Sequence, residues 1–272
     1  MSLDKYKQIN LTFAYQMSSI IKESINIDYE YYTKGFVLEI IEKNKLLLVK
    51  FSKFTILHFY IEKEIWNKLN YETSHYMKEH ECEIAIEKLY NIVDLYNPLF
   101  YKEIDVFDLL EQENQEDSEE SYLNLCNSII DILYQEIEKY MPNMVEDVFY
   151  VLFQDREFLL EFNLMLSNII SEIKYEDESE IMRKDGVLKR CSYFPKWLKE
   201  GIFFRDKGRC QKCNTNLTGT ITMGTNYNWD HIVPLSLGGI NDATNIQLLC
   251  EKCNKIKSDK EIYTSNKYFR FW

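Results

Sequence analysis

Two Cys-x-x-Cys pairs near the C-terminus constrain this chain more than any other feature of its sequence. Cys210 and Cys213 form the first pair, Cys250 and Cys253 form the second, and 36 residues (positions 214–249) separate them. Each pair can form a tight turn that offers two thiolates, and four thiolates are what a tetrahedral zinc ion requires. Because four cysteines close the coordination shell, we expect a structural zinc ion that joins two distant segments of the chain.

The other cysteines and the hydropathy pattern indicate where the protein resides. The chain has seven cysteines, an odd number that does not suit a disulfide framework. No apolar run follows a basic N-terminal segment, and no run approaches the length of a membrane helix. We therefore expect a cytoplasmic protein with no membrane contact, in which Cys82, Cys126 and Cys191 are small buried hydrophobic side chains.

Charge divides the sequence into two parts. Residues 183–272 carry 16 Lys and Arg against 8 Asp and Glu, a net charge of +8, whereas residues 1–182 carry 16 against 36, a net charge of −20. Together they give the net charge of −12 for the chain. The reversal predicts an acidic domain over residues 1–182, which binds a protein partner or self-associates, and a basic domain over residues 183–272, which meets a polyanion.

The acidic part is expected to be mainly helical. Apolar residues recur at intervals of three and four in residues 5–25, 84–96, 122–140 and 145–173, which is the period of amphipathic helices. Proline is expected to end the third of these helices at Pro142, and the fourth is expected to break near residues 154–157. Residues 36–41 and 46–51 are compatible with either a hairpin or buried helix, and the acidic run 111–120 predicts a solvated loop or linker. His58, His75 and His80 are interpreted as structural or surface residues.

The segment between the cysteine pairs has the pattern of a hairpin followed by a helix. A short helix over residues 195–206 leads into the first pair, and the β-prone run 226–231 ends in Asp230 and His231. Gly238 and Gly239 supply a turn, residues 245–249 return toward the second pair, and residues 251–260 are expected to be helical. His231 is the only histidine after residue 80, so any imidazole base of this module must be His231.

These residues resemble the HNH endonucleases of the ββα-metal class. The resemblance rests on Cys-x-x-Cys, Asp-His-Ile-Val-Pro, Gly-Gly, Asn-Ile-Gln-Leu-Leu-Cys and Cys-Asn-x-x-Lys, and it covers residues 194–260. The three positions that name the family fall on His231, Asn245 and Asn254, so this chain is an HNN variant. The resemblance implies an α+β protein in which a mainly helical N-terminal domain precedes a small zinc-stabilised ββα-metal (HNH) nuclease domain.

The resemblance also implies the roles of individual residues. Asp230 and Asn254 would hold one divalent ion, usually Mg²⁺, at the scissile phosphate, in keeping with the preference of hard cations for oxygen ligands. His231 would act as the general base on the attacking water. Asn245 would brace the loop around His231, and the products would carry a 5′ phosphate and a 3′ hydroxyl.

Basic residues around the motif are expected to contact phosphates without reading sequence. They are Arg205, Arg209, Lys255, Lys257 and Lys260. The whole sequence therefore predicts a DNA endonuclease with little intrinsic sequence specificity, acting in anti-phage defence under the control of its helical domain. Two alternatives stay open: a zinc-stabilised nucleic-acid-binding or assembly module without catalysis, and a nuclease that acts on RNA.

Overall fold

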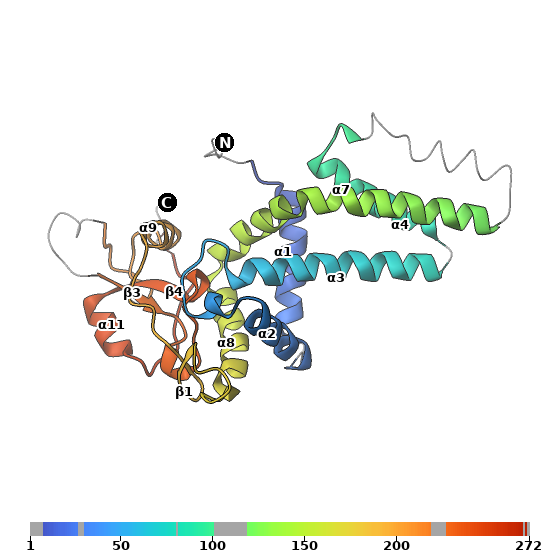
Figure 1. The fold of residues 1–272 in the computed structure, drawn as a ribbon. Helices are drawn as coiled ribbons and strands as arrows, with labels where there is room; N and C mark the ends of the chain where they lie inside the picture. The colour runs from blue at the N-terminus through green and yellow to red at the C-terminus, as the bar shows by residue number, and fades with distance from the viewer. Residues whose placement is uncertain are drawn as a thin grey trace. The chain divides into compact units, whose positions relative to one another are not determined.

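The structure, a computed structural model, describes residues 8–26, 30–79, 81–100, 119–218, 227–268 and 270 (Figure 1). The chain folds into two compact units. Unit 1 consists of Met1–Ser19 and Ile61–Phe149, and unit 2 consists of Ile20–Tyr60 and Tyr150–Trp272. A mainly helical N-terminal part thus precedes a small C-terminal region of short strands and one helix, which confirms the predicted fold class. No helix within the described ranges combines the length and apolar composition needed to cross a bilayer.

The regular structure of unit 1 is helical throughout the part of the chain that the structure describes. It comes from α4 (Cys82–Tyr96) and from the greater part of α1 (Leu11–Asn26), α3 (Ile56–Lys78) and α7 (Glu119–Gln154), each of which has one end in unit 2. The apolar face of α4 is buried as its period predicts. Cys82 and Cys126 are both buried, with their sulfur atoms 2.8 Å apart, whereas Cys191 of unit 2 is only half-buried. The predicted loop 111–120 lies outside the described residues except for its last two positions, which begin α7.

Pro142 does not end a helix, so the prediction from sequence is wrong at this position. Instead, α7 continues through the proline to Gln154. Met141, Met144 and Val145 around the proline are almost fully buried, and this packing outweighs the hydrogen bond that a proline removes from a helix. The break predicted near residues 154–157 is present, because Asp155 caps the N-terminus of α8 (Arg156–Glu172) by accepting a 3.2 Å hydrogen bond from the Phe158 amide.

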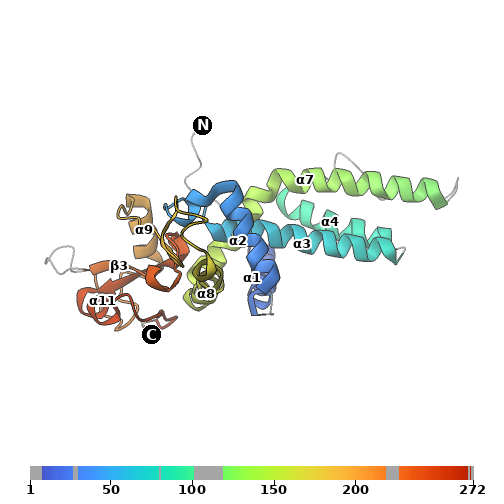
Figure 2. The same cartoon turned by 60° about the horizontal axis from the view of Figure 1, so that its bottom comes forward.

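Neither run forms a hairpin: residues 36–41 lie in α2 (Glu30–Asn44), which agrees with the helical alternative, whereas the run 46–51 begins in the 3₁₀ turn η1 (Lys45–Leu48) and continues without helix over residues 49–51. Phe36, Val37 and Ile40 are buried together, as residues at spacings of three and four on one helical face should be. Both elements lie in unit 2, which Figure 2 shows from a second side.

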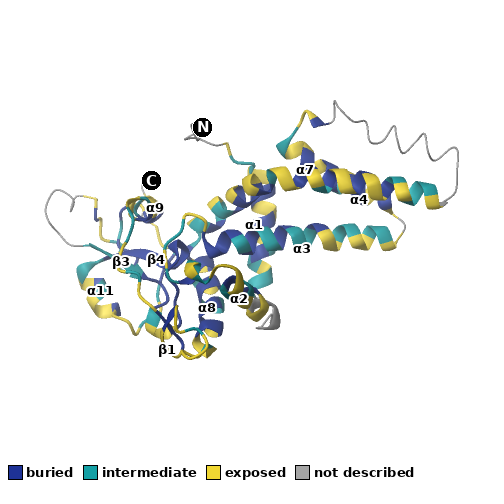
Figure 3. Ribbon diagram, viewed as in Figure 1, coloured by how far each residue is buried: buried dark blue, intermediate teal, exposed yellow. Residues whose placement is uncertain are grey.

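A two-stranded antiparallel sheet and a helix form the C-terminal part of unit 2. Strand β3 (Tyr227–His231) pairs with β4 (Ile246–Cys250), with His231 opposite Ile246, and α11 (Glu251–Lys257) follows β4 directly. Figures 1 and 2 both show α11 beside β3. Helix α9 (Lys196–Arg205) covers the sheet through a buried apolar cluster that includes Leu198, Ile202 and Leu248. Figure 3 shows dark blue, buried residues along β4 and on α8, whereas β3 is mostly half-buried.

A second, smaller hairpin precedes α9 and has no counterpart among the elements predicted from sequence. Strand β1 (Met182–Lys184) pairs antiparallel with β2 (Val187–Leu188) around the turn Asp185-Gly186. Gly186 has φ +67, and a Cβ atom there would lie 2.7 Å from the carbonyl oxygen of Ser171. Glycine therefore lets the hairpin turn approach the end of α8 closely.

The long connection between β3 and β4 is tied to earlier parts of unit 2. Asp242 accepts a 3.0 Å hydrogen bond from the Ile56 amide at the start of α3, and the Asn241 amide donates 3.1 Å to the carbonyl of Leu48. Gly238, with φ +82, would place a Cβ atom 2.5 Å from the carbonyl oxygen of Ser167 in α8. These contacts place residues 20–60 in the same unit as the hairpin–helix module. The domain boundary at residue 182 stays a prediction from the charge distribution.

Candidate active site and metal centre

Four cysteines meet at one corner of the β3–β4–α11 module. The first pair follows α9, and the second spans the end of β4 and the first turn of α11, where Cys250 Sγ accepts a 3.4 Å hydrogen bond from the Cys253 amide. Their four sulfur atoms lie within 4.8 Å of one another, and those of Cys213 and Cys250 are 3.8 Å apart. A tetrahedral ion with bonds of about 2.3 Å separates its sulfur ligands by about 3.8 Å. The donor set therefore fits zinc.

Hydrogen bonds already favour the thiolate at Cys213. Burial acts to raise the pKa of Cys213, but the hydroxyl of Thr215, 3.1 Å from its sulfur, and the Thr215 backbone outweigh burial and lower the pKa to about 6. Burial raises the pKa of Cys210, so this deeper sulfur needs a bound cation to lose its proton. One thiol that ionises readily and one that requires a cation to ionise are what a metal-binding site needs, because metal binding displaces the remaining protons.

Asp230 occupies the end of β3 with one oxygen engaged. Its Oδ2 atom lies 3.0 Å from the ammonium of Lys257 and accepts a 3.2 Å hydrogen bond from the amide of Gln247 on β4. Burial raises the pKa of Asp230, and the positive charge of Lys257 opposes that shift. No described residue hydrogen-bonds Oδ1, so this oxygen is available to a cation.

His231 follows Asp230 and is only 8% exposed. Within the described residues, no group hydrogen-bonds its Nε2 atom. Burial lowers the pKa of His231 to about 4, the positive charge of Arg190 adds to the shift, and a hydrogen bond with the Asn241 side chain opposes it. The imidazole is therefore neutral at physiological pH, which is the form that accepts a proton.

Asn245 ends the 3₁₀ turn η3 (Ala243–Asn245) and is fully buried. Its Oδ1 atom accepts a 2.8 Å hydrogen bond from the Val233 amide, and its Nδ2 atom donates to the carbonyl oxygens of Val233 at 2.9 Å and Ile240 at 3.0 Å. These three bonds use both N–H groups and the oxygen of the amide, and they hold the loop that follows His231 against β4. This is the placement expected of a brace, while its part in catalysis stays a prediction.

Asn254 lies on α11 and faces the same cavity as Asp230 and His231. The cavity has a volume of about 450 Å³, and its walls also include the turn after α11, where Ser258 has φ +53. Three residues from β3 and α11 thus converge on one opening. Carboxylate and amide oxygens beside a neutral imidazole can hold a hard cation, with a proton acceptor next to it.

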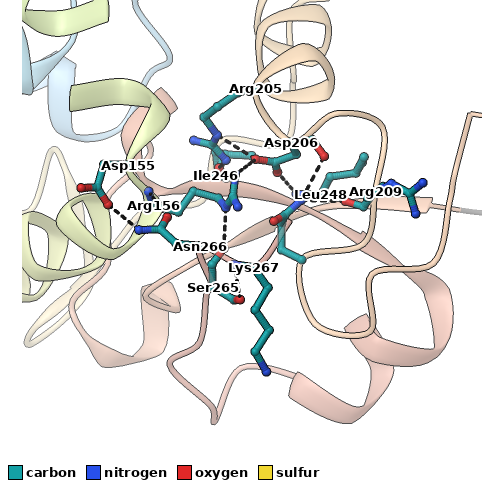
Figure 4. Close-up of polar contacts among 11 residues, drawn as sticks. Asp155, Arg156, Arg205, Asp206, Arg209, Ile246, Leu248, Ser265, Asn266 and Lys267 are labelled. Atoms are coloured by element: carbon teal, nitrogen blue, oxygen red, sulfur yellow. Dashed lines mark hydrogen bonds and ion pairs between the residues drawn. The ribbon is translucent and has the colours of Figure 1, made fainter. Parts of the chain in front are cut away.

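Two of the five predicted phosphate-binding residues are buried, which corrects that prediction for them. Arg205 is 3% exposed, donates 2.8 Å from Nε to Asp206 and 2.6 Å from Nη2 to the carbonyl of Ile246, and is drawn in Figure 4. Lys257 is 1% exposed, with its ammonium 2.7 Å from the carbonyl oxygen of His231. Both cations are held by internal carboxylates, as buried charges must be.

The other three predicted cations are more accessible. Arg209 is half-buried and donates 3.1 Å to the carbonyl of Asn214, Lys255 is exposed and paired with Glu251 four residues earlier, and Lys260 is exposed. None of the three lines the cavity that holds His231. A phosphate contact by these residues stays a prediction.

The cations that do line this cavity are Arg183, Lys184 and Arg190, on and after the β1–β2 hairpin. From sequence alone, this basic run indicates only a domain boundary. A further signal is nevertheless present, because four basic residues surround an Asp-Gly turn shortly before the motif. The burial of Lys257 could also be found from sequence, since it lies four residues after the metal-ligand candidate Cys253 and so shares its helical face.

Comparison with known proteins relates the C-terminal segment to one family. Residues 210–260 match the family model described as HNH endonuclease. No curated protein and no solved structure matches the chain. The matched segment holds all four clustered cysteines together with Asp230, His231, Asn245 and Asn254, which supports a nuclease-type function on nucleic acid for this part of the protein.

Proposed function

We propose that the protein is a metal-dependent endonuclease that hydrolyses phosphodiester bonds in DNA. The observation that carries this proposal is the convergence of Asp230, His231 and Asn254 on one cavity, within a segment that matches the HNH family. Each residue then has a role that its chemistry suits. The zinc ion is structural, because its four cysteines fill the shell.

The catalytic ion would be Mg²⁺ or another divalent cation, held by Oδ1 of Asp230 and the side-chain oxygen of Asn254. When bound, such an ion stabilises negative charge on the scissile phosphate and on the departing oxygen. Lys257 keeps Oδ2 of Asp230 engaged and so leaves Oδ1 directed to the cavity. An amide oxygen at position 254 is a weaker ligand than a carboxylate but still an oxygen donor, so the HNN pattern suits Mg²⁺.

His231 removes a proton from the attacking water at Nε2, the ring nitrogen that has no partner among the described residues. The water oxygen forms a new bond to phosphorus while the bond to the 3′ oxygen breaks, and that oxygen leaves with the electron pair and is protonated from solvent. The products carry a 5′ phosphate and a 3′ hydroxyl. Asn245 contributes by fixing the loop, through its hydrogen bonds to Val233 and Ile240.

We further propose a cytoplasmic role in anti-phage defence. Reduced thiols in the cytoplasm would keep the four cysteines available to zinc. A nuclease with little sequence specificity needs restraint in its host, and the −20 charge of residues 1–182 suits a domain that shields the basic part or binds a protein that senses an invader. Infection of cells that express wild-type protein or His231→Ala tests this role: protection that the variant retains would contradict it.

Plasmid cleavage tests the enzymatic proposal. Supercoiled DNA is incubated with full-length protein and Mg²⁺ or Mn²⁺, beside His231→Ala and the matched control His75→Ala, an exposed histidine on α3. We expect nicking that His231→Ala abolishes and His75→Ala retains. Binding without nicking in every metal would instead favour the non-catalytic module, and cleavage restricted to an RNA transcript would reassign the substrate.

A further inference from the structure

The β1–β2 hairpin forms one wall of the catalytic cavity, although it lies outside the segment that matches the HNH family. Met182 and Leu188 are buried, whereas Arg183 and Lys184 are exposed. The hairpin is held in place at its turn, where the Gly186 amide donates a 2.9 Å hydrogen bond to the carbonyl of Ile173 after α8. Its exposed cations are therefore carried on a supported element rather than on a free loop.

Three cations on this wall differ from their neighbours in having no partner among the described residues. Lys45 pairs with Glu178 and Glu180, Lys174 pairs with Asp185, and Lys189 donates 2.8 Å to the carbonyl of Glu180. In contrast, no described residue forms an ion pair or hydrogen bond with the side chain of Arg183, Lys184 or Arg190. An unpaired guanidinium beside a cavity is free to bind an anion, and its planar fork suits two phosphate oxygens.

Arg190 lines the same cavity as the proposed catalytic residues Asp230 and His231. The cavity, of about 450 Å³, contains Asp230, His231 and Asn254 together with the three cations. The three unpaired cations therefore line the cavity into which the scissile phosphate would have to bind.

We propose that Arg190, Arg183 and Lys184 form a phosphate clamp for the nucleic-acid backbone, with Arg190 on the scissile phosphate and the hairpin pair on a neighbouring one. This clamp rests on the proposed nuclease function and extends it to residues upstream of the motif. It replaces Arg205 and Lys257, which are buried, as the source of phosphate contacts.

Binding is measured first, in a His231→Ala background so that the DNA is not consumed. Arg190→Gln, Arg183→Gln and the control Lys189→Gln, which lies on the same hairpin flank but has a partner elsewhere, are titrated with a short duplex at several salt concentrations. Each lost phosphate contact should reduce the slope of log K against log salt by about one unit. We expect this loss for Arg190→Gln and Arg183→Gln and an unchanged slope for Lys189→Gln.

Cleavage then separates the two parts of the clamp. With His231 intact, Arg190→Gln should raise KM and also lower kcat, because its contact is made in the bound state and strengthens as charge develops on the scissile phosphate. Arg183→Gln should raise KM and leave kcat nearly unchanged. Arg190→Lys should restore part of kcat, since it keeps the charge and loses the fork. Thermal unfolding of each variant identifies one that has simply lost its fold, in which case Arg190→Lys provides the comparison.

The outcomes distinguish the clamp from the nuclease itself. Weaker DNA binding by Arg190→Gln in a protein that never cuts would keep the clamp and reject the nuclease. Cleavage by the wild type with Arg190→Gln equal to Lys189→Gln in binding and rate would reject the clamp alone. Inorganic phosphate is also tested as a competitor of duplex binding. If it displaces the duplex at a concentration as low as that of the duplex, the cations form a site for free phosphate, and the clamp is overturned.

Discussion

At the scale of single residues, Lys257 shows how a buried charge organises the site. Its ammonium lies between Oδ2 of Asp230 at 3.0 Å and the carbonyl oxygen of His231 at 2.7 Å. A cation in this position must be paired, because isolated charge is costly in a protein interior. The same pairing fixes the carboxylate that faces the cavity and the backbone of the proposed base. Lys257 is thus a positioning residue and not a phosphate contact.

Replacing Lys257 by methionine should destabilise unit 2, because Asp230 would remain buried without its cation. Breaking a buried pair by removing one partner costs about 3–5 kcal/mol, and urea denaturation measures the loss. Lys255→Met is the matched control on the same helix, where the exposed pair with Glu251 should contribute less than about 1 kcal/mol. Adding Asp230→Asn to Lys257→Met should recover part of the stability, and equal losses in Lys257→Met and Lys255→Met would contradict this account.

At the scale of elements, the cysteine cluster joins three segments of the module. It links the turn after α9, the end of β4 and the first turn of α11, which is only seven residues long. A helix of that length is marginal by itself in water. The position of Asn254 would therefore depend on a metal ion bound by the four cysteines, because such an ion would hold the start of its helix.

Zinc removal should therefore loosen α11 and β4 while sparing unit 1. After chelation, we expect faster amide hydrogen exchange over residues 246–257 and unchanged exchange over α4. Cys213→Ser should bind less than one zinc per chain by elemental analysis, whereas Cys191→Ser, a cysteine outside the cluster, should retain a full ion. A Cys213→Ser protein with a full zinc ion and amide hydrogen exchange equal to that of the wild type would contradict the structural role of the cluster.

The success of sequence reasoning also differs between elements. The helices α1, α4, α7 and α8 and the hairpin–helix module follow from their periods and from the Cys, Asp-His and Asn spacings, whereas α3 has no counterpart among the predicted helices. The prediction at Pro142 fails because local propensity does not register the burial of Met141 and Val145 around it. The β1–β2 hairpin escapes prediction because strands of three and two residues carry no measurable period. Placement of Arg190 in the cavity depends on that hairpin and could not be predicted without it.

At the scale of the whole molecule, the nuclease-like module depends on residues far from it in sequence. Asp242 is held by the Ile56 amide, Asn241 by the carbonyl of Leu48, and Thr244 by the side chain of Asn163 at 3.3 Å. The buried Asp206 faces not only Arg205 but also Arg156 of α8, 3.8 Å away, as Figure 4 shows. These distant partners lie within residues 20–60 or in α8, all within unit 2.

A fragment of residues 183–272 should therefore not fold as the module does in the full chain. The fragment would lose the hydrogen bonds that tie Asp242 to Ile56 and Asn241 to Leu48, and the apolar surface that residues 20–60 and α8 cover would be exposed to water. We expect poor amide dispersion in a two-dimensional NMR spectrum of the zinc-loaded fragment, and well-dispersed signals from the intact protein. A well-dispersed fragment spectrum that overlays on the full chain would show that the charge boundary at residue 182 is also a folding boundary.

One further consequence follows from α3, whose residues 56–60 belong to unit 2 and residues 61–78 to unit 1. Its 23 residues span about 35 Å. Its first backbone amide, that of Ile56, donates a hydrogen bond to Asp242, which lies three residues before Asn245 in the sequence. Successive turns of a helix are joined by hydrogen bonds, so a displacement of α3 near its start would be passed through the Ile56 amide to Asp242 and to the 3₁₀ turn that contains Asn245.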